Sequence, residues 1–332
     1  MLRAMAAFLV LTCLSGMARA QGLDQPLRPT QTLKITPLTP ASAETAGPVL
    51  GRGGATATLR SPQAERGVLS SFRFGFMGTD HKVNTLGVLV QGQRAEFILR
   101  DRDANDPFRA HATWLQSPSY SATQEVSAHA SGDVKIDLPA GPAGHVALLQ
   151  GFQFKRARAT DANVRLVAVQ VAEDSRSVRV ALVDDQGADF RGMDGVQSLG
   201  LAALTLGELL ALPVFGARLT GTLPEFDERR LRTYTVTVQY VWVPPSLVLG
   251  AGLVAGTTRM ADAGTLPDSK DKVGLRGFRF AFGNSDHHLR SVGVDLTVPP
   301  RQAPILFQDN NLDDPVAWSV GFVRVMGSGL AF

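Results

Sequence analysis

The chain is short of several residue types, and each shortage excludes a class of protein. It has 332 residues but only one cysteine, Cys13. A disulfide framework, a zinc–thiolate site and an iron–sulfur cluster are therefore excluded within one chain. The formal net charge is only +3, too small for the concentrated basic face of a nucleic-acid-binding protein. Charged residues make up 19% and hydrophobic residues 44%. That balance excludes a disordered polyelectrolyte and suffices for a buried core.

The first twenty residues predict a signal peptide. Arg3 gives a positive start, an apolar run follows from Ala4 to Leu14, and Ala18-Arg19-Ala20 offers the small residues that signal peptidase accepts. The apolar run is too short to span a bilayer. We therefore expect cleavage after Ala20, export to the periplasm or the medium, and no transmembrane segment in the remainder. Cleavage would remove the cysteine and lower the formal charge to +1, because two arginines and no acids leave.

Residues 21–66 are rich in Pro, Thr, Ala and Gly, as in Thr36-Pro37-Leu38-Thr39-Pro40-Ala41. No hydrophobic periodicity persists there for more than a few residues. The composition predicts an extended, weakly ordered leader with at most one short strand, at Ala55–Leu59.

The strongest signal is an internal self-match. Phe72-Arg73-Phe74-Gly75-Phe76 recurs as Phe278-Arg279-Phe280-Ala281-Phe282, and each is followed at equal spacing by an Asp-His pair. After a two-residue slip, the acidic stretch 101–107 recurs as 309–315, both ending in Asp-Pro. The arginine inside each Phe-Arg-Phe step is expected on the opposite face of its strand from the phenylalanines.

A third and weaker copy lies between these two. It begins at Phe152-Gln153-Phe154, has Ala162 in the histidine position, and reaches an acidic stretch at 184–189. An insertion at about 192–230 interrupts it, with helical character at Val196–Leu212. The predicted organisation is therefore repeat 1 at 67–140, repeat 2 at 145–245 with its insertion, a linker or strand at 246–268, and repeat 3 at 269–326.

The sequence of each copy predicts several short strands. Phe72, Phe74 and Phe76 alternate with small or polar residues, the period-two pattern of a sheet with one buried face. Further strands are expected at Val126–Leu138 and Leu247–Val254. Many short strands separated by Gly, Pro, Asn and Asp turns predict an all-β protein of tandem degenerate repeats, built as β-sandwich-like modules, with a partly helical insertion in the middle repeat.

The candidate site is a loop corner at one end of each copy. If the first three strands of a copy form an antiparallel meander, the Asp-His turn and the acidic loop lie at the same end of the sheet. The predicted ligand corner consists of Asp80, His81, Asp286 and His287. The predicted metal ligands in the acidic loops are Asp101, Asp103, Asn105, Asp106, Asp309, Asn311, Asp313 and Asp314.

Two interpretations of this corner remain open. Alternating carboxylates and amides are hard oxygen ligands of the kind that Ca²⁺ takes, although the loop lacks the Gly and the distal Glu of an EF-hand. Alternatively, Asp and Asn form side-chain-to-backbone turns, and the histidine pairs with an acid. Under the first interpretation, calcium is the expected cofactor.

The sequence favours a binding protein over an enzyme. The repeat pattern is similar, at the level of fold only, to small β-sandwich lectin modules, which is not an argument for function by itself. The first hypothesis is a non-enzymatic module that recognises a carbohydrate or another cell-surface component, supported by calcium. The second is an assembly protein that associates with itself or a partner through β edges and aromatic faces. The third, a glycoside hydrolase-like enzyme using paired acids, has the least support.

Overall fold

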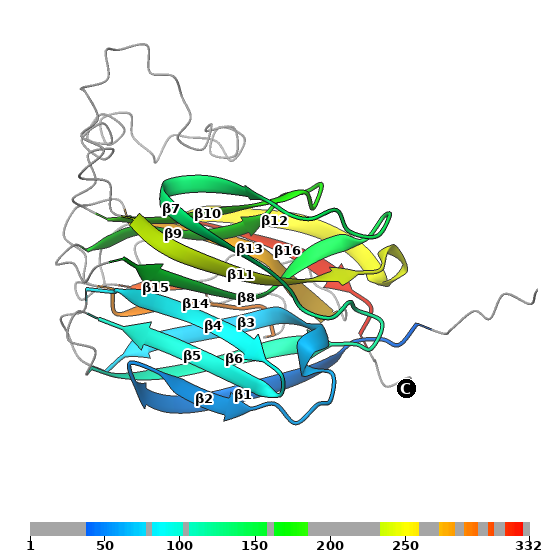
Figure 1. Cartoon of the computed structure of the whole chain (residues 1–332), viewed down its shortest axis with the longest axis horizontal. Helices are drawn as coiled ribbons and strands as arrows, with labels where there is room; N and C mark the ends of the chain where they lie inside the picture. Colours follow the sequence, from blue (N-terminus) through cyan, green and yellow to red (C-terminus); the bar gives the residue numbers. More distant parts are fainter. Residues whose placement is uncertain are drawn as a thin grey trace, which may run out of the picture. The chain divides into compact units, whose positions relative to one another are not determined.

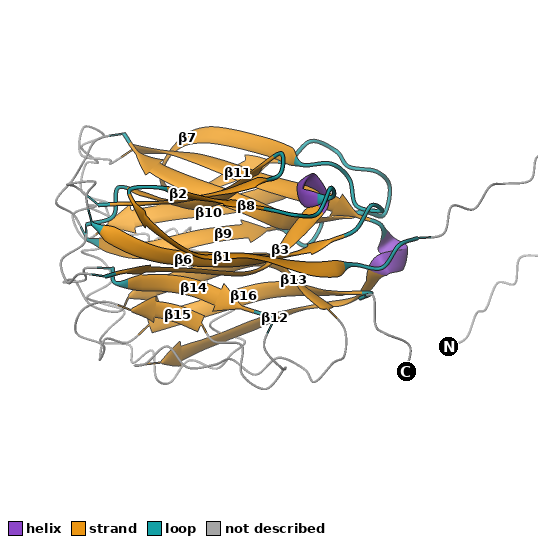
Figure 2. Cartoon of the chain, turned by 90° about the horizontal axis from the view of Figure 1, so that it is seen from below, coloured by secondary structure: helices purple, strands orange, loops and turns teal. Residues whose placement is uncertain are grey.

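The computed structural model describes residues 38–77, 82–101, 106–157, 163–184, 233–258, 272–282, 289–297, 305–308 and 316–327. All of them lie in one compact unit, Leu38–Phe332. These residues form strands and two single-turn 3-10 helices, η1 (Ala64–Arg66) and η5 (Pro245–Leu247), and no α-helix (Figure 2). The all-β prediction is confirmed for this part of the chain. None of its helices has the length and apolarity needed to cross a membrane.

The sixteen strands fall into two antiparallel sheets (Figure 1). The five-stranded sheet has the order β1-β6-β3-β14-β15, and the larger, eleven-stranded sheet has the order β12-β16-β13-β9-β10-β7-β11-β8-β4-β5-β2. The strands are β1 (Ser42–Arg52), β2 (Ala55–Thr58), β3 (Gly67–Phe76), β4 (Thr85–Gln91), β5 (Arg94–Arg100), β6 (Pro107–Gln116), β7 (Gln124–Asp137), β8 (Val146–Arg156), β9 (Val164–Val171), β10 (Ser177–Asp184), β11 (Thr233–Val243), β12 (Val248–Thr258), β13 (Lys272–Phe282), β14 (Ser291–Asp295), β15 (Ile305–Gln308) and β16 (Val316–Val325).

Three groups of four strands share one pairing pattern. Segment I is β3 to β6, segment II is β8 to β11 and segment III is β13 to β16. In each segment the first strand pairs with the fourth, and the second pairs with the third. The second strand also pairs with the first strand of another segment: β4 with β8, β9 with β13, and β14 with β3.

This pattern corrects the expected meander. β3 pairs with β6 and β14, so it does not lie beside β4, the next strand in sequence. In each segment, the second and third strands pair with each other. The second strand also pairs with the first strand of another segment, which joins the segments into shared sheets. The β-sandwich-like, all-β character is thus found in two large antiparallel sheets, in which strands of different segments pair with one another. The hydrophobic pattern was sufficient to find the strands, but it carries no information about which strands become neighbours.

The pairing between segments keeps the same register at each junction. Phe72 lies opposite Val294, Phe152 opposite Val88, and Phe278 opposite Val169. At one of these junctions, Gly87 lies opposite Gln153. A Cβ on Gly87 would come within 2.4 Å of the carbonyl oxygen of Phe152, so the close approach of these two strands requires glycine there.

Three phenylalanines, one from each segment, meet in the interior. The ring centroids of Phe72, Phe152 and Phe278 are 5.0, 4.9 and 5.1 Å apart, and the rings are tilted or edge-on to one another. All three side chains are buried. Such contacts within about 4.5–7 Å are the favourable range for aromatic pairs. The largest hydrophobic cluster among the described residues therefore contains side chains from all three segments.

Each segment has a fifth strand, which lies beside its fourth. β1 pairs with β6, β7 with β11, and β12 with β16. The strands expected at Val126–Leu138 and Leu247–Val254 are thereby confirmed as β7 and β12. The weakly ordered leader is corrected, because β1 and β2 occupy much of residues 42–58. β1 is largely exposed and lacks apolar alternation, so backbone pairing with β6, which a sequence pattern does not show, orders it.

Two other predictions fall outside the described residues. They are the signal peptide at 1–20 and the insertion at about 192–230 with its expected helix. Both stay predictions.

Candidate functional site

Only two of the predicted site residues lie in the part of the chain that the structure describes. Asp101, directly after β5, is buried, and Asp106, directly before β6, is half-buried. Within the described ranges, no group of three or more His, Cys, Asp or Glu side chains could hold a metal ion. The other predicted residues lie outside the described ranges: Asp80, His81, Asp103, Asn105, Asp286, His287, Asp309, Asn311, Asp313 and Asp314.

The residues that flank the predicted corner of segment I do lie together. The amide of Met77, just before the Asp-His turn, donates to the carbonyl oxygen of Pro107, just after the acidic loop, at 3.0 Å. The amide of Asn84 donates to the carbonyl oxygen of Arg100 at 2.8 Å. Both flanks of the turn therefore touch the flanks of the acidic loop, although through a different strand pairing from the expected meander.

The matching position in segment II holds a buried ion pair. Nη1 of Arg156 lies 2.5 Å from Oδ2 of Asp184, and both side chains are only 3% exposed. Nε of Arg156 also donates to the carbonyl oxygen of Val83 at 3.1 Å. Arg156 stands two residues beyond the Phe-x-Phe step, where the other segments have Phe76 and Phe282. The middle segment therefore has a buried salt bridge where the other two segments have a phenylalanine.

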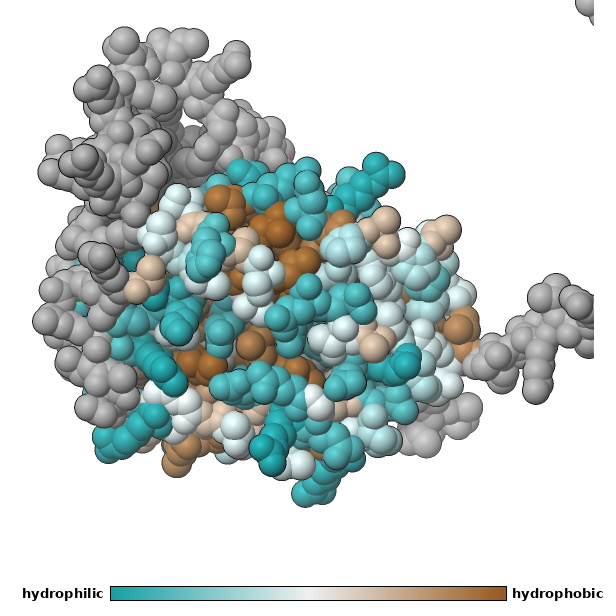
Figure 3. All heavy atoms as spheres, viewed as in Figure 1, coloured by the Kyte–Doolittle hydropathy of each residue, from teal (hydrophilic) through white to brown (hydrophobic). Residues whose placement is uncertain are grey.

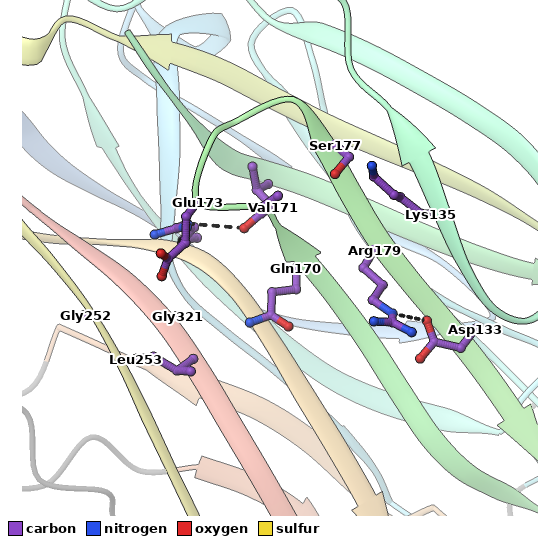
Figure 4. A pocket seen from close by; sticks show the side chains of 12 residues that line it. Asp133, Lys135, Gln170, Val171, Glu173, Ser177, Arg179, Gly252, Leu253 and Gly321 are labelled. Carbon is purple, nitrogen blue, oxygen red and sulfur yellow. Dashed lines mark hydrogen bonds and ion pairs between the residues drawn. The ribbon is translucent and has the colours of Figure 1, made fainter. Parts of the chain in front are cut away.

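A hollow on the described surface lies elsewhere, over the strands of segments II and III. We call it the outer groove (Figure 4). It has a volume of about 570 Å³ and opens on the face of the large sheet opposite the core phenylalanines. Its lining residues are Asp133, Lys135, Gln170, Val171, Ala172, Glu173, Ser177, Arg179, Gly252, Leu253, Arg276 and Gly321.

Five lining residues of the outer groove belong to one row of cross-strand neighbours, which Gly277 completes. Directly opposed pairs link the following residues in order across six strands: Lys135, Arg179, Gln170, Gly277, Gly321 and Leu253. Because neighbouring strands lie about 4.8 Å apart, this row spans about 24 Å. It is polar at the β7 and β10 end and apolar at the β12 end. Figure 4 shows Gln170 between the Arg179–Asp133 pair on one side and Leu253 on the other. The groove therefore has the dimensions of a site for an extended ligand.

A β-bulge places Arg276 in this groove. The register between β13 and β16 shifts between Leu275 and Gly277, so Arg276 is the extra residue. Bulges also occur at Ser70 in β3 and at Gln150 in β8, the corresponding positions of segments I and II. A bulge changes the direction of a side chain and leaves a ladder position unpaired. Nε of Arg276 donates to the carbonyl oxygen of Val171 at 3.2 Å, which fixes the guanidinium at the groove.

The charges of the groove are partly paired. Asp133 accepts from Nε of Arg179 at 2.6 Å and from Nη1 of Arg279 at 3.1 Å. Arg279 is the arginine of the Phe-Arg-Phe step, and it does lie on the face opposite the phenylalanines. Burial lowers the pKa of Arg279 and of Arg276 from the ordinary arginine value, and attraction to Asp133 and to Glu173, respectively, opposes that shift. Each guanidinium therefore lacks part of the hydration that an exposed arginine would have.

The corresponding place in the other half of the large sheet is filled. Gln239 of β11 lies at the position equivalent to Gly321 of β16, because each follows the valine opposite its segment's first Phe. The Gln239 side chain is buried. Its amide accepts from the amide of Val90 at 2.8 Å and donates to the carbonyl oxygen of Val90 at 3.1 Å. Glycine at 321 leaves this volume empty, which opens the groove.

The groove was not found from the sequence. Its residues come from six strands, and their pairing across segments does not follow the order of the chain. The one available signal was Arg279, which the alternation placed outside the core. The outer faces of the sheets are otherwise mixed. On the face shown in Figure 3, hydrophobic residues are interspersed with hydrophilic ones.

Comparison with known protein families finds no model that matches the chain, and comparison with curated proteins finds no match. The function is therefore argued from the described residues.

Proposed function

We propose that the chain is an exported, non-enzymatic binding module that recognises a carbohydrate or another cell-surface component. The outer groove is the single observation that carries this proposal. Its lining residues offer guanidinium, ammonium, carboxylate, amide and hydroxyl groups, which suits a ligand with many hydroxyl groups. Such convergent polar groups in a concave site of several hundred Å³ are typical of ligand recognition.

The proposal includes a common origin for the three segments. Its support is the equal register at the three inter-segment junctions, the equivalent bulges, and the meeting of one phenylalanine from each segment. On this view the interior keeps the shared pattern while the outer faces differ. Only the face that carries Gly321 and Arg276 has been opened for a ligand.

Binding of a glycan array by the full chain, with and without a chelator, tests the proposal. We expect binding that is lost in Gly321→Gln, because that side chain would fill the groove as Gln239 fills the equivalent place. The Cβ of residue 321 would meet only ordinary contacts, the nearest at 3.7 Å from Cβ of Arg276, so the variant is expected to fold. An array without any binding overturns the proposal. Loss of binding with the chelator would support calcium in the predicted acidic loops.

One observation favours the second candidate function, an assembly protein. β12 is the last strand of the large sheet, carries no charged residue, and exposes Leu249 and Leu253. Uncharged edge strands are templates for pairing with another chain. Light scattering after size exclusion tests this candidate, with Leu249→Lys as the variant. An oligomer that the substitution dissociates supports it, and a monomer at all concentrations contradicts it.

A further inference from the structure

The burial and the hydrogen bonding of Arg276 indicate which chemical group the outer groove binds, provided that the groove is a binding site as proposed above. Arg276 is only 9% exposed. Its guanidinium makes one hydrogen bond among the described residues, from Nε to the carbonyl oxygen of Val171. A guanidinium has five N–H donors in a planar fork. The two terminal nitrogens therefore make no hydrogen bond within the described part of the chain, and Arg276 lines the groove.

The nearest acid is a weak partner for this cation. Oε1 of Glu173 lies 3.9 Å from Nη2 of Arg276, beyond hydrogen-bond distance, and the Glu173 side chain is 92% exposed. An exposed ion pair of this kind is worth little. Glu173 can therefore swing into solvent and leave the fork of Arg276 to a stronger anionic partner. The fork geometry matches a carboxylate that accepts two parallel hydrogen bonds.

The neighbours of Arg276 favour a saccharide over an acidic peptide as the bearer of that carboxylate. Gln170 lies next to the bulge in the cross-strand row, and Ser177 lines the groove. Asp133 supplies an acceptor for the hydroxyl groups that a saccharide carries and an acidic peptide lacks. Lys135 at the far end of the row provides a second cation for an extended acidic ligand.

We infer that the outer groove binds an acidic oligosaccharide, with a sugar carboxylate held in a bidentate manner by Nη1 and Nη2 of Arg276 and with the adjoining hydroxyls held by Gln170 and Asp133. Glu173 is displaced when the ligand enters. The ligand carboxylate then accepts hydrogen bonds from the two terminal nitrogens of Arg276.

Calorimetric titration of the full chain with an oligogalacturonate, and with its methyl-esterified form, tests this inference. The two probes share a sugar skeleton and differ in the carboxylate charge. We expect the acid to bind at least about tenfold more tightly than the ester, since a charge-assisted bidentate contact is lost in the ester. Arg276→Gln should weaken binding of the acid by a similar factor and leave binding of the ester unchanged. Glutamine occupies the equivalent bulge at Gln150, so this variant is expected to keep the fold.

Arg73→Gln is the matched control. It removes an exposed arginine from the other sheet, and it should change neither affinity. Equal affinity for acid and ester, both abolished by Gly321→Gln, would overturn the acidic ligand but leave the groove as a saccharide site. Binding of neither probe, together with a silent glycan array, would overturn both proposals. Tighter binding of a poly-glutamate peptide than of the oligogalacturonate would overturn the saccharide.

Discussion

The two halves of the large sheet have different side chains at equivalent places on their outer faces. Val90 of β4 and Val171 of β9 occupy equivalent positions beside a bulge. In the half that contains β8 and β11, the buried Gln239 hydrogen-bonds to the backbone of Val90 and fills the outer face. In the half that contains β13 and β16, Gly321 leaves that volume empty, and Arg276 reaches the carbonyl oxygen of Val171 from the bulge. Equivalent backbones thus present a closed face in one half and a charged groove in the other.

The interiors of the two halves differ much less. Phe152 and Phe278 contact Phe72 at nearly equal centroid distances of 5.0 and 4.9 Å, the first edge-on and the second tilted. Close packing resists change in the interior, whereas an outer face can exchange a glutamine for a glycine if its backbone groups find other partners. The comparison therefore predicts similar responses to interior substitutions and different responses to outer ones.

Replacing the three central phenylalanines one at a time should have the largest effect. Phe72→Ala, Phe152→Ala and Phe278→Ala are each expected to lower the free energy of unfolding by about 3–5 kcal/mol. Denaturant unfolding measures this. Leu50→Ala, at a position 66% exposed, is the control and should change stability by less than about 0.5 kcal/mol. If one phenylalanine can be removed at little cost, the three segments do not share the core equally.

Arg156→Phe introduces the residue type that the other segments have at this position and should nevertheless destabilise the fold strongly. It leaves the buried carboxylate of Asp184 without the guanidinium 2.5 Å away, at an expected cost of about 3–5 kcal/mol. Thermal unfolding at neutral pH measures it. The double variant Arg156→Phe with Asp184→Leu should recover part of the loss, because no buried charge remains. A single variant as stable as the wild type would show that the ion pair does not matter for folding.

Exchanging the two outer residues tests the comparison directly. Gln239→Gly should lower the free energy of unfolding by about 1–3 kcal/mol, because the amide and carbonyl of Val90 lose their buried partner. Gly321→Gln should change stability by less than about 1 kcal/mol, because its contacts are of ordinary length. Chemical denaturation of both variants gives the two values. Equal costs would contradict the different roles assigned to these positions.

Two tyrosine variants should have the smallest effects at neutral pH. Burial raises the pKa of Tyr234 and of Tyr120 above the ordinary value of 10.0. The folded state then binds the phenolic proton more tightly than the unfolded state does. Stability is therefore unaffected well below pH 10 and falls as the pH rises above it, by up to about 1.4 kcal/mol per pH unit for each tyrosine.

The hydroxyls of these tyrosines differ in their partners. That of Tyr234 donates to the carbonyl oxygen of Gly132 at 2.8 Å, whereas that of Tyr120 is buried without a hydrogen-bond partner among the described residues. At pH 7, Tyr234→Phe should cost about 1 kcal/mol and Tyr120→Phe should cost nothing. Unfolding measured from pH 7 to 11 should show a shallower alkaline decline in both variants. An unchanged decline would contradict the assigned pKa shifts.

Much of the fold followed from local pattern. The alternation at Phe72, Phe74 and Phe76 identified β3 with one buried face, and the strands at β7 and β12 were found in the same way. The pattern failed for β1, whose order comes from pairing with β6 rather than from its own apolar residues. It also failed for the pairing of β3, because period two specifies a buried face and not a neighbour.

The candidate site was much less accessible to sequence reasoning. The acidic loops were predicted as a site because they recur and because their carboxylates and amides are spaced like calcium ligands, yet only Asp101 and Asp106 of that set lie among the described residues. Arg276 did not stand out, since its role depends on a bulge, and a bulge is defined by two strands together. Gly321 did not stand out either, because the sequence does not show which strands lie beside it or what space its missing side chain leaves.

The order of residues alone determined which stretches form strands and which side of each strand is buried, because side chains alternate every two residues whatever the partner strand is. Tertiary structure decided the rest. It joined strands of different segments at a common register, brought a lysine, an arginine, a glutamine and two glycines into one row, and aimed the buried guanidinium of Arg276 at that row. The reason is physical: backbone hydrogen bonds between strands are the same for every sequence, so the choice of partner depends on how the shared core packs.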